Sequence, residues 1–230
     1  MDPERDNIGR HPRARRGGGA RKHDENSDVR LSKTLSFILR HGAAKVGLQL
    51  GSDGFLYVDD ILALPQCRAY TTADVLRVVE NNNKQRYAVR SHPADGKLQI
   101  RANQGHSLQV TDLDLTLLTT DDTLPENAIH GTYLRHWPSI KSRGLSRMSR
   151  IHIHMTTHLP TEEEVVSGIR KDCEVAVFID LPKALSDGLK FYSSANGVIL
   201  TPGDGDGFLP PRYFQKVLQL KPNRCLLPLD

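Results

Sequence analysis

The stretch Leu31–Gly42, LSKTLSFILRHG, constrains the fold most, because its apolar residues recur at the spacing of one helix face: Leu31, Leu35, Ile38 and Leu39. We expect this face to pack into a core, with Asp28 as the N-cap and Gly42 as the C-terminal stop. Arg40 and His41 then occupy the last helical turn, where the helix dipole favours cations and tends to keep an imidazole protonated. Two interpretations remain open at this point. The pair either complements the helix dipole or belongs to a functional site.

Composition limits the class of protein. With 230 residues, 38% of them hydrophobic and 25% charged, the chain can hold one large globular domain or two small ones. It contains neither an apolar run of membrane-spanning length nor an apolar N-terminal targeting segment, so we expect no membrane association. The cysteines are odd in number and far apart, which excludes a disulfide framework and gives no zinc-ligand spacing: Cys67, Cys173 and Cys225. We therefore expect a cytoplasmic or nuclear protein, in a reducing compartment, with no metal site.

Residues 1–27 are basic and glycine-rich. They hold seven Lys or Arg against five Asp or Glu, which accounts for half of the formal net charge of +4. Almost no apolar residue is available for burial, so we expect a disordered tail. Such a tail can attract phosphates non-specifically, or it can be a solvated appendage without a catalytic role.

Residues 28–118 are predicted to form helices followed by a hairpin. Thr71 or Thr72 can cap a helix that buries valines of one face: Val75, Val78 and Val79. Arg86–Arg90 and Leu98–Ala102 alternate as strands on either side of a turn-rich connection. Three helices and a hairpin indicate a winged-helix lobe, a fold that often serves nucleic acids but does not by itself establish function.

Residues 124–230 change to short strands with few helices, and we place the boundary in the acidic, Thr-rich piece Thr119–Pro125. Tyr133–Arg143 is expected to be a helix stopped by Gly144. Four segments are expected to be strands: Ala128–Thr132, Ile151–Met155, Val175–Ile179 and Gly197–Thr201. The fold class is therefore α+β, with two lobes and a cleft between them.

Long cations recur beside residues that permit tight backbone, in Lys84–Tyr87, Gln104–Ser107 and Ser167–Arg170. Each guanidinium offers paired donors that match two phosphate oxygens, so several of them converging with an imidazole suit a phosphate dianion. Taken singly, each of these arginines can equally be a surface residue. Only a cleft could bring them together.

Seven segments, in this order, resemble the KptA-type tRNA 2′-phosphotransferase family: LSK through RHG (31–42), KQR (84–86), QGHS (104–107), HGT (130–132), HIH (152–154), SGIR (167–170) and SANGV (194–198). The resemblance spans about Asp28 to Leu220 and is particularly close to the vertebrate members, through Arg101-Ala102-Asn103 and Thr201-Pro202-Gly203. It implies a winged-helix RNA lobe and an NAD lobe of ADP-ribosyltransferase fold. The implied reaction moves an internal 2′-phosphate of RNA, left at a ligated tRNA splice junction, to NAD as co-substrate, through an ADP-ribosylated RNA-phosphate intermediate. The implied products are 2′-OH RNA, nicotinamide and ADP-ribose 1″,2″-cyclic phosphate.

The resemblance also assigns site residues. Matched by motif, the catalytic set is Arg40, His41, Arg86 and Arg170. The matched NAD-binding residues are His130, Gly131, Thr132, His152, His154, Ser194 and Asn196. Departures from the family pattern are small: Ile169 replaces the common Met, Lys171 a frequent Ser, and Met155-Thr156 the usual Leu-Ser. We expect a monomer.

The chemistry accounts for the residue types. Two negatively charged substrates must be held together against repulsion, so positioning and electrostatic stabilisation dominate. In the second step His41 could donate a proton to the departing RNA oxygen. The pair His152 and His154 points to one face of a strand, so both could line the cleft, or one could hold the other. Two other functions stay open: ADP-ribosylation of terminal RNA phosphates or of protein, and non-catalytic RNA binding.

Overall fold

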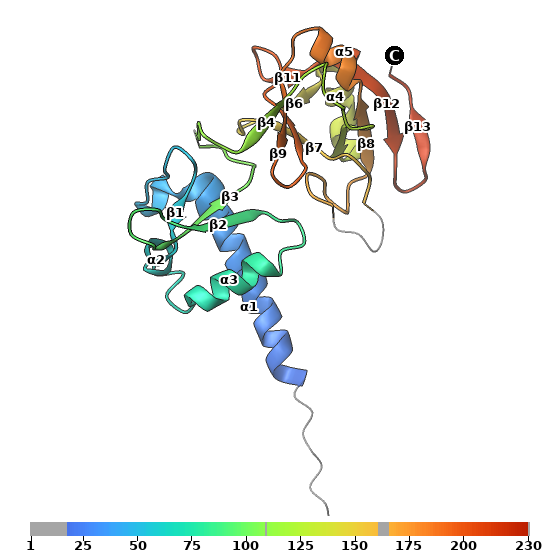
Figure 1. Ribbon diagram of the computed structural model, residues 1–230. Helices are drawn as coiled ribbons and strands as arrows, with labels where there is room; N and C mark the ends of the chain where they lie inside the picture. Colours follow the sequence, from blue (N-terminus) through green and yellow to red (C-terminus); the bar gives the residue numbers. More distant parts are fainter. Residues whose placement is uncertain (1–17, 109, 161–165, 230) are drawn as a thin grey trace, which may run out of the picture.

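The computed structural model describes residues 18–108, 110–160 and 166–229. They form two lobes, each with its own hydrophobic core, so the α+β class is confirmed. Figure 1 shows the N-terminal lobe, with α1 to α3 and β1 to β3, below the larger C-terminal lobe. Within these described residues no helix is long and apolar enough to cross a membrane.

Helix α1, Gly18–Phe37, and the turn that follows it carry the apolar face that the sequence predicts. All four expected core residues are fully buried: Leu31 and Leu35 in α1, and Ile38 and Leu39 in the following turn. The bounds of α1 differ from the prediction. Residues 18–27 are helical, so a disordered tail over that stretch is wrong, while residues 1–17 lie outside the described residues. Asp28 lies inside the helix and pairs with Arg77, its Oδ1 at 2.7 Å from Nη2, instead of capping.

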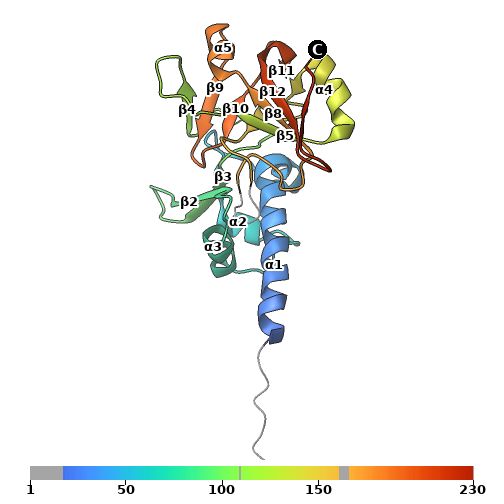
Figure 2. The same ribbon diagram turned by 90° about the vertical axis from the view of Figure 1, so that its right-hand side faces the viewer.

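The C-terminal end of α1 continues instead of stopping at Gly42. Ile38–Gly42 forms a π-helical turn and Ala44–Val46 a 3₁₀ turn, and Gly47, with a φ of 78°, ends the run. Arg40 and His41 therefore lie on a widened turn. Figure 2 shows this end of α1 directed at the C-terminal lobe.

A three-stranded antiparallel sheet, in the order β1-β3-β2, completes the N-terminal lobe. Its elements are β1 (Leu56–Tyr57), α2 (Val58–Leu62), α3 (Thr72–Glu80), β2 (Tyr87–Ser91) and β3 (Leu98–Ala102). The Thr71 cap is confirmed, because Thr71 and Asp74 form a capping box at the start of α3. The hairpin pairs Tyr87 with Ala102, close to the prediction.

The C-terminal lobe contains two four-stranded antiparallel sheets and a two-stranded one, in the orders β4-β9-β10-β7, β13-β12-β8-β5 and β11-β6. The strands are β4 (Leu115–Leu118), β5 (Ile129–Thr132), β6 (Leu145–Ser146), β7 (Ile153–Met155), β8 (Val175–Ile179), β9 (Phe191–Ser194), β10 (Ile199–Thr201), β11 (Phe208–Leu209), β12 (Phe214–Gln219) and β13 (Cys225–Leu227). The helices are α4 (Trp137–Arg143) and α5 (Leu181–Ser186), and short 3₁₀ turns span Leu134–His136 and Pro211–Tyr213. A single core of residues from both larger sheets joins them.

The boundary between the lobes comes earlier than the sequence predicts. Strand β4 pairs with β9, with Leu115 opposite Ser194, so it belongs to the C-terminal lobe. The amides of Thr111 and Asp112 still donate to the carbonyl of Ser52 in the N-terminal lobe. The chain therefore crosses between Asp112 and Leu115. A boundary at Thr119–Pro125 is wrong, because LTLL at 115–118 is a sheet strand and not the end of the first lobe.

Candidate active site

A cavity of about 560 Å³ lies between the lobes. Seven of its lining residues are cationic: Arg40, Lys84, Arg86, Arg135, Arg147, Arg150 and Arg170. None of the described residues that line it is Asp or Glu. Three of the four expected catalytic residues and five of the seven expected NAD ligands line this one cavity. Such a concentration of unopposed positive charge suits polyanionic ligands.

Arg40 is packed against Gly105 at the end of α1. Gly105 has a φ of 89°, and a Cβ placed there would lie 3.4 Å from Arg40 Nε, so glycine permits this close approach. Arg40 Nε and Nη2 are buried with no hydrogen-bond partner among the described residues. Burial lowers the pKa of Arg40 to about 10, and the charges of Arg86 and Arg150 add to this effect. A buried, unpartnered guanidinium is costly, so an anion at this position would be strongly favoured.

Arg86 is held at the start of β2 by its neighbours. Asn82 Oδ1 accepts from the Arg86 amide at 3.1 Å and from Nη1 at 3.3 Å. The next residue, Tyr87, is anchored on α1: its hydroxyl donates to the carbonyl of Ser32 at 2.6 Å and lies 2.7 Å from Ser36 Oγ. The serines of the LSKTLS motif thus fix β2 against the helix that ends in Arg40.

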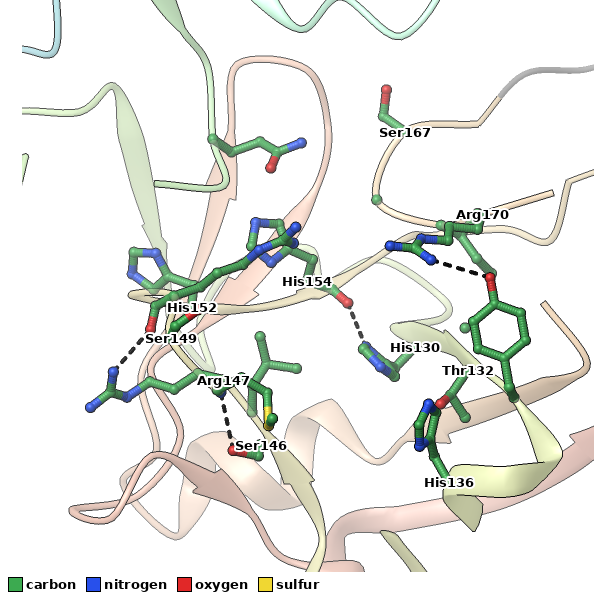
Figure 3. Close-up of a pocket in the computed structure, with 18 of the residues that line it drawn as sticks. His130, Thr132, His136, Ser146, Arg147, Ser149, His152, His154, Ser167 and Arg170 are labelled. Carbon is green, nitrogen blue, oxygen red and sulfur yellow. Dashed lines mark hydrogen bonds between the residues drawn. The ribbon is translucent and has the colours of Figure 1, made fainter. Parts of the chain in front are cut away.

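Arg170 comes from the C-terminal lobe. Its Nη1 donates to the Tyr133 hydroxyl at 3.3 Å, and that hydroxyl donates to Asp172 Oδ2 at 3.0 Å. The hydrogen bond and charge interaction with Tyr133 raise the pKa of Arg170. The Tyr133 hydroxyl thus supports the Arg170 guanidinium, and Figure 3 shows this hydrogen bond.

His41 does not line the cavity. Its Nδ1 lies 2.9 Å from Ser107 Oγ, and the Ser107 amide donates to the carbonyl of Arg40 at 2.9 Å. Burial, followed by the charges of Arg150, Arg40 and Lys45, lowers the pKa of His41. This direction is opposite to the one expected from the helix dipole, because burial and the nearby cations outweigh it.

The three expected histidines of the C-terminal lobe, His130, His152 and His154, line the cavity. His130 Nδ1 donates to the carbonyl of His154 at 2.8 Å, which fixes the ring (Figure 3). His154 is 7% exposed, and its Nε2 has no hydrogen-bond partner among the described residues. Burial is the largest cause that lowers the pKa of His130, His152 and His154. His152 and His154 both line the cavity, which answers the question that the strand pattern left open.

Ser194 and Asn196 lie outside the cavity lining, unlike the other expected NAD ligands. Ser194 Oγ donates to Asn196 Oδ1 at 2.8 Å, and Asn196 Nδ2 donates to the carbonyl of Lys84 at 3.0 Å. Asn196 therefore bonds the opposite lobe instead of facing the cavity, and Ser194 orients Asn196 from within the C-terminal lobe.

Several cavity residues were missed by sequence reasoning: Gln104, Tyr133, Arg135, His136, Arg147 and Arg150. Arg150 is the most central of them, since its charge lowers the pKa of Arg40, His41, His130 and His154. The signal was the basic turn RMSR at 147–150, two residues before His152. Its Arg147 Nη1 donates to the carbonyl of Arg150 at 2.9 Å, which closes the turn.

Comparison with known proteins decides the family. The model of the RNA 2′-phosphotransferase, Tpt1 / KptA family matches residues 26–203. The chain belongs to this family. It is therefore a transferase enzyme, and the Tpt1/KptA resemblance is confirmed.

Named members of the Tpt1/KptA family are similar over most of their length. tRNA 2′-phosphotransferase 1 of Danio rerio is 56% identical over 214 residues, which cover 93% of this chain and 95% of that protein. The Homo sapiens protein of the same name is 53% identical over 209 residues, or 91% and 83% of the two chains. The tRNA 2′-phosphotransferase of Saccharomyces cerevisiae is 35% identical over 201 residues, or 84% and 85%.

Proposed function

We propose that this Tpt1/KptA member removes an internal 2′-phosphate from RNA and transfers it to NAD. The observation that carries the proposal is the cavity shared by both lobes, with seven cations and no described carboxylate in its lining. Two negatively charged substrates can occupy such a site together, because the cations offset their repulsion. In this proposal the N-terminal lobe is a winged-helix RNA module and the C-terminal lobe an ADP-ribosyltransferase-like NAD module.

In this proposal the N-terminal lobe binds the RNA 2′-phosphate and the C-terminal lobe binds NAD. Arg40 and Arg86 would hold the RNA 2′-phosphate, since each guanidinium offers paired donors and Arg40 has buried nitrogens without partners. His130, Gly131, Thr132, His152 and His154 would hold NAD. The unpartnered Nε2 of His154 supports this, because a polar ligand would supply its missing hydrogen bond. Neutral imidazoles can exchange hydrogen bonds with NAD without adding further positive charge.

In the first step the RNA 2′-phosphate oxygen attacks C1″ of the nicotinamide ribose, and nicotinamide leaves with the electron pair of the glycosidic bond. The leaving group is cationic before the bond breaks, so little acid catalysis is required. Arg40, Arg86 and Arg170 contribute by holding the phosphate in line against the ribose. The product of this step is an ADP-ribosylated RNA phosphate.

In the second step the ribose O2″ attacks phosphorus and releases its hydroxyl proton to water. The P–O bond to the RNA breaks, and the RNA 2′-oxygen leaves with that electron pair and takes a proton. This gives 2′-OH RNA and ADP-ribose 1″,2″-cyclic phosphate. The arginines stabilise the phosphate oxygens as charge builds on them. His41 would supply the proton: the bound phosphate raises the proton affinity of a nearby imidazole, which opposes the surrounding cations. Ser107 at Nδ1 would hold the ring so that Nε2 faces the leaving oxygen.

The relatives are named tRNA 2′-phosphotransferases, so we propose ligated tRNA splice junctions as the RNA, acted on by a monomer in the cytoplasm or nucleus.

The test is incubation of an internally 2′-phosphorylated oligonucleotide with and without NAD. We expect 2′-OH RNA, nicotinamide and the cyclic phosphate in equal amounts, only when NAD is present. A stable ADP-ribosylated RNA as the end product would favour ADP-ribosylation as the main activity. Dephosphorylation without NAD would contradict the proposal.

A further inference from the structure

Lys84 is bonded to the C-terminal lobe at two points. Its carbonyl accepts from Ser167 Oγ at 2.7 Å and from Asn196 Nδ2 at 3.0 Å. Its ammonium donates to the carbonyl of Ile169 at 2.9 Å. Three hydrogen bonds thus join one residue of the N-terminal lobe to two separate loops of the other lobe.

The partners of Lys84 are themselves held in place. Ser194 Oγ donates to Asn196 Oδ1 at 2.8 Å, which turns the amide so that Nδ2 faces Lys84. The side chain of Ile169 packs against Gly131 in β5: a Cβ placed at Gly131 would clash with Ile169 Cγ1 and lie 2.7 Å from its Cδ1. The loop that carries Arg170 therefore packs against β5 through the Ile169 side chain and is hydrogen-bonded to Lys84 through the Ile169 carbonyl.

The backbone between Lys84 and Arg86 is strained. Gln85 has a φ of 44°, a region that residues other than glycine rarely adopt. Its amide donates to the carbonyl of Asn82 at 2.7 Å, and its carbonyl accepts from Asn103 Nδ2 at 2.7 Å, so both sides of the kink are fixed. The kink lets Lys84 present its carbonyl to the C-terminal lobe while Arg86, two residues on, reaches the cavity. Strain of this kind persists only where the surroundings enforce it.

We infer that Lys84, Ser167 and Asn196 form a latch that sets the position of Arg86 relative to Arg170. Arg86 follows the latched residue by two positions, and Arg170 follows the latched carbonyl of Ile169 by one. Ser194 and Asn196 are then positioning residues, not NAD ligands. The inference rests on the proposed function, since it assigns the latch to aligning an RNA phosphate with NAD.

The experiment compares Ser167→Ala, Asn196→Ala and the double variant, with Ser193→Ala, on strand β9 just before Asn196, as the control. Each single variant leaves the Lys84 carbonyl with one donor, so we expect kcat to fall about threefold to fivefold. The double variant removes both donors, and we expect a fall of about 30-fold or more, greater than the product of the single effects. The affinity for NAD alone, measured by calorimetry, should stay within about twofold of wild type in every variant. Ser193→Ala should match wild type.

Three results would overturn the latch. A loss of NAD affinity in Asn196→Ala that matches its loss of activity would make Asn196 an NAD ligand. A wild-type kcat in the folded double variant would remove the positioning role. In Lys84→Met, a raised KM for RNA with unchanged kcat would make Lys84 a phosphate ligand. If a variant does not fold, Asn196→Asp serves instead, because it keeps the shape and replaces the donor with an oxygen.

A second measurement separates failure of the latch from failure of the proposed function. Hydrogen exchange of the amides of residues 167–170 needs no substrate, and in Asn196→Asp and Lys84→Met we expect it to be about tenfold faster than in wild type. The amide of Ile151, which donates to the carbonyl of His106 at 3.1 Å, still joins the lobes, so its protection should persist. Unchanged exchange at 167–170 would contradict the latch, whereas an inactive wild-type protein would contradict the proposed function.

Discussion

At the scale of single residues, Arg150 has the widest electrostatic effect in the cavity. The residue is exposed overall, yet partial desolvation of its guanidinium, followed by the charge of Arg170, lowers the pKa of Arg150. Cations this close repel one another in the free protein. A bound polyanion attracts each of these cations and so offsets their mutual repulsion, which is unfavourable without a ligand.

Arg150→Ala should therefore slow phosphate removal. Loss of one charge-assisted contact costs about 1.5–3 kcal/mol, which is roughly a 10- to 100-fold fall in kcat/KM. Arg143→Ala is the matched control, because Arg143 lies on α4 and donates to Ser139 Oγ, outside the cavity lining. Equal rates for wild type and folded Arg150→Ala would remove Arg150 from the site.

His106 gives a prediction about pH and stability. It is 2% exposed, and burial, with the charges of Arg40, His41, Arg101 and His152, lowers its pKa to about 4. The unfolded chain takes up this proton near pH 6.5, but the folded protein does not until about pH 4. Stability from neutral His106 is therefore complete at pH 7 and is lost as pH falls from about 6.5 to about 4. The loss is about 3 kcal/mol in the free energy of unfolding.

The contribution of His106 to the pH dependence of stability can be measured by denaturant unfolding of wild type and His106→Leu at several pH values. The variant should show a smaller decrease in unfolding free energy between pH 7 and pH 4, whatever its stability at pH 7. The other buried histidines contribute equally to both proteins, so the difference isolates His106. Identical pH dependence in the two proteins would mean that His106 titrates normally in the folded state.

At the scale of elements, β5 supports the loop that carries Arg170. Gly131 in β5 leaves room for Ile169, and an added Cβ would also lie 3.1 Å from Cys173 Sγ. Gly131→Ala should push Ile169 outward and displace Arg170. Overpacking of this kind costs about 1–3 kcal/mol of stability.

A second substitution tests whether the clash with Ile169 causes the loss of activity in Gly131→Ala. Ile169→Ala in the Gly131→Ala background removes the atoms that clash, so we expect it to recover part of the lost turnover, measured with the 2′-phosphorylated oligonucleotide. Additive losses in the double variant would show that Gly131 acts through some contact other than Ile169.

The sequence predicted elements best where one pattern dominated. The apolar face of α1, the Thr71 cap and the β2–β3 hairpin followed from periodicity and capping chemistry. β4 was missed because its pairing partner, β9, lies more than seventy residues later in the chain, and local periodicity carries no information on such pairing. The extension of α1 beyond Gly42 was also missed, because a π-helical turn has no local sequence signal of its own.

At the scale of the whole molecule, the site exists only where the two lobes meet. The motif resemblance supplied Arg40, Arg86 and Arg170, and the structure brings them to one cavity. It could not assign Arg150, because a basic turn resembles any exposed turn, nor the position of Asn196, because a motif does not show which way a side chain points. Side-chain direction depends on contacts between lobes, which only the folded structure reveals.

The most direct test of the central claim, NAD-dependent transfer in two steps within this cavity, uses an NAD analogue that lacks the 2″-hydroxyl of the nicotinamide ribose. C1″ and its leaving group remain, so the first step can proceed, but the second has no nucleophile. We predict that ADP-ribosylated RNA accumulates and 2′-OH RNA does not form, with hydrolysis of the analogue measured in an RNA-free control. Formation of 2′-OH RNA and nicotinamide at equal rates with this analogue would contradict the account.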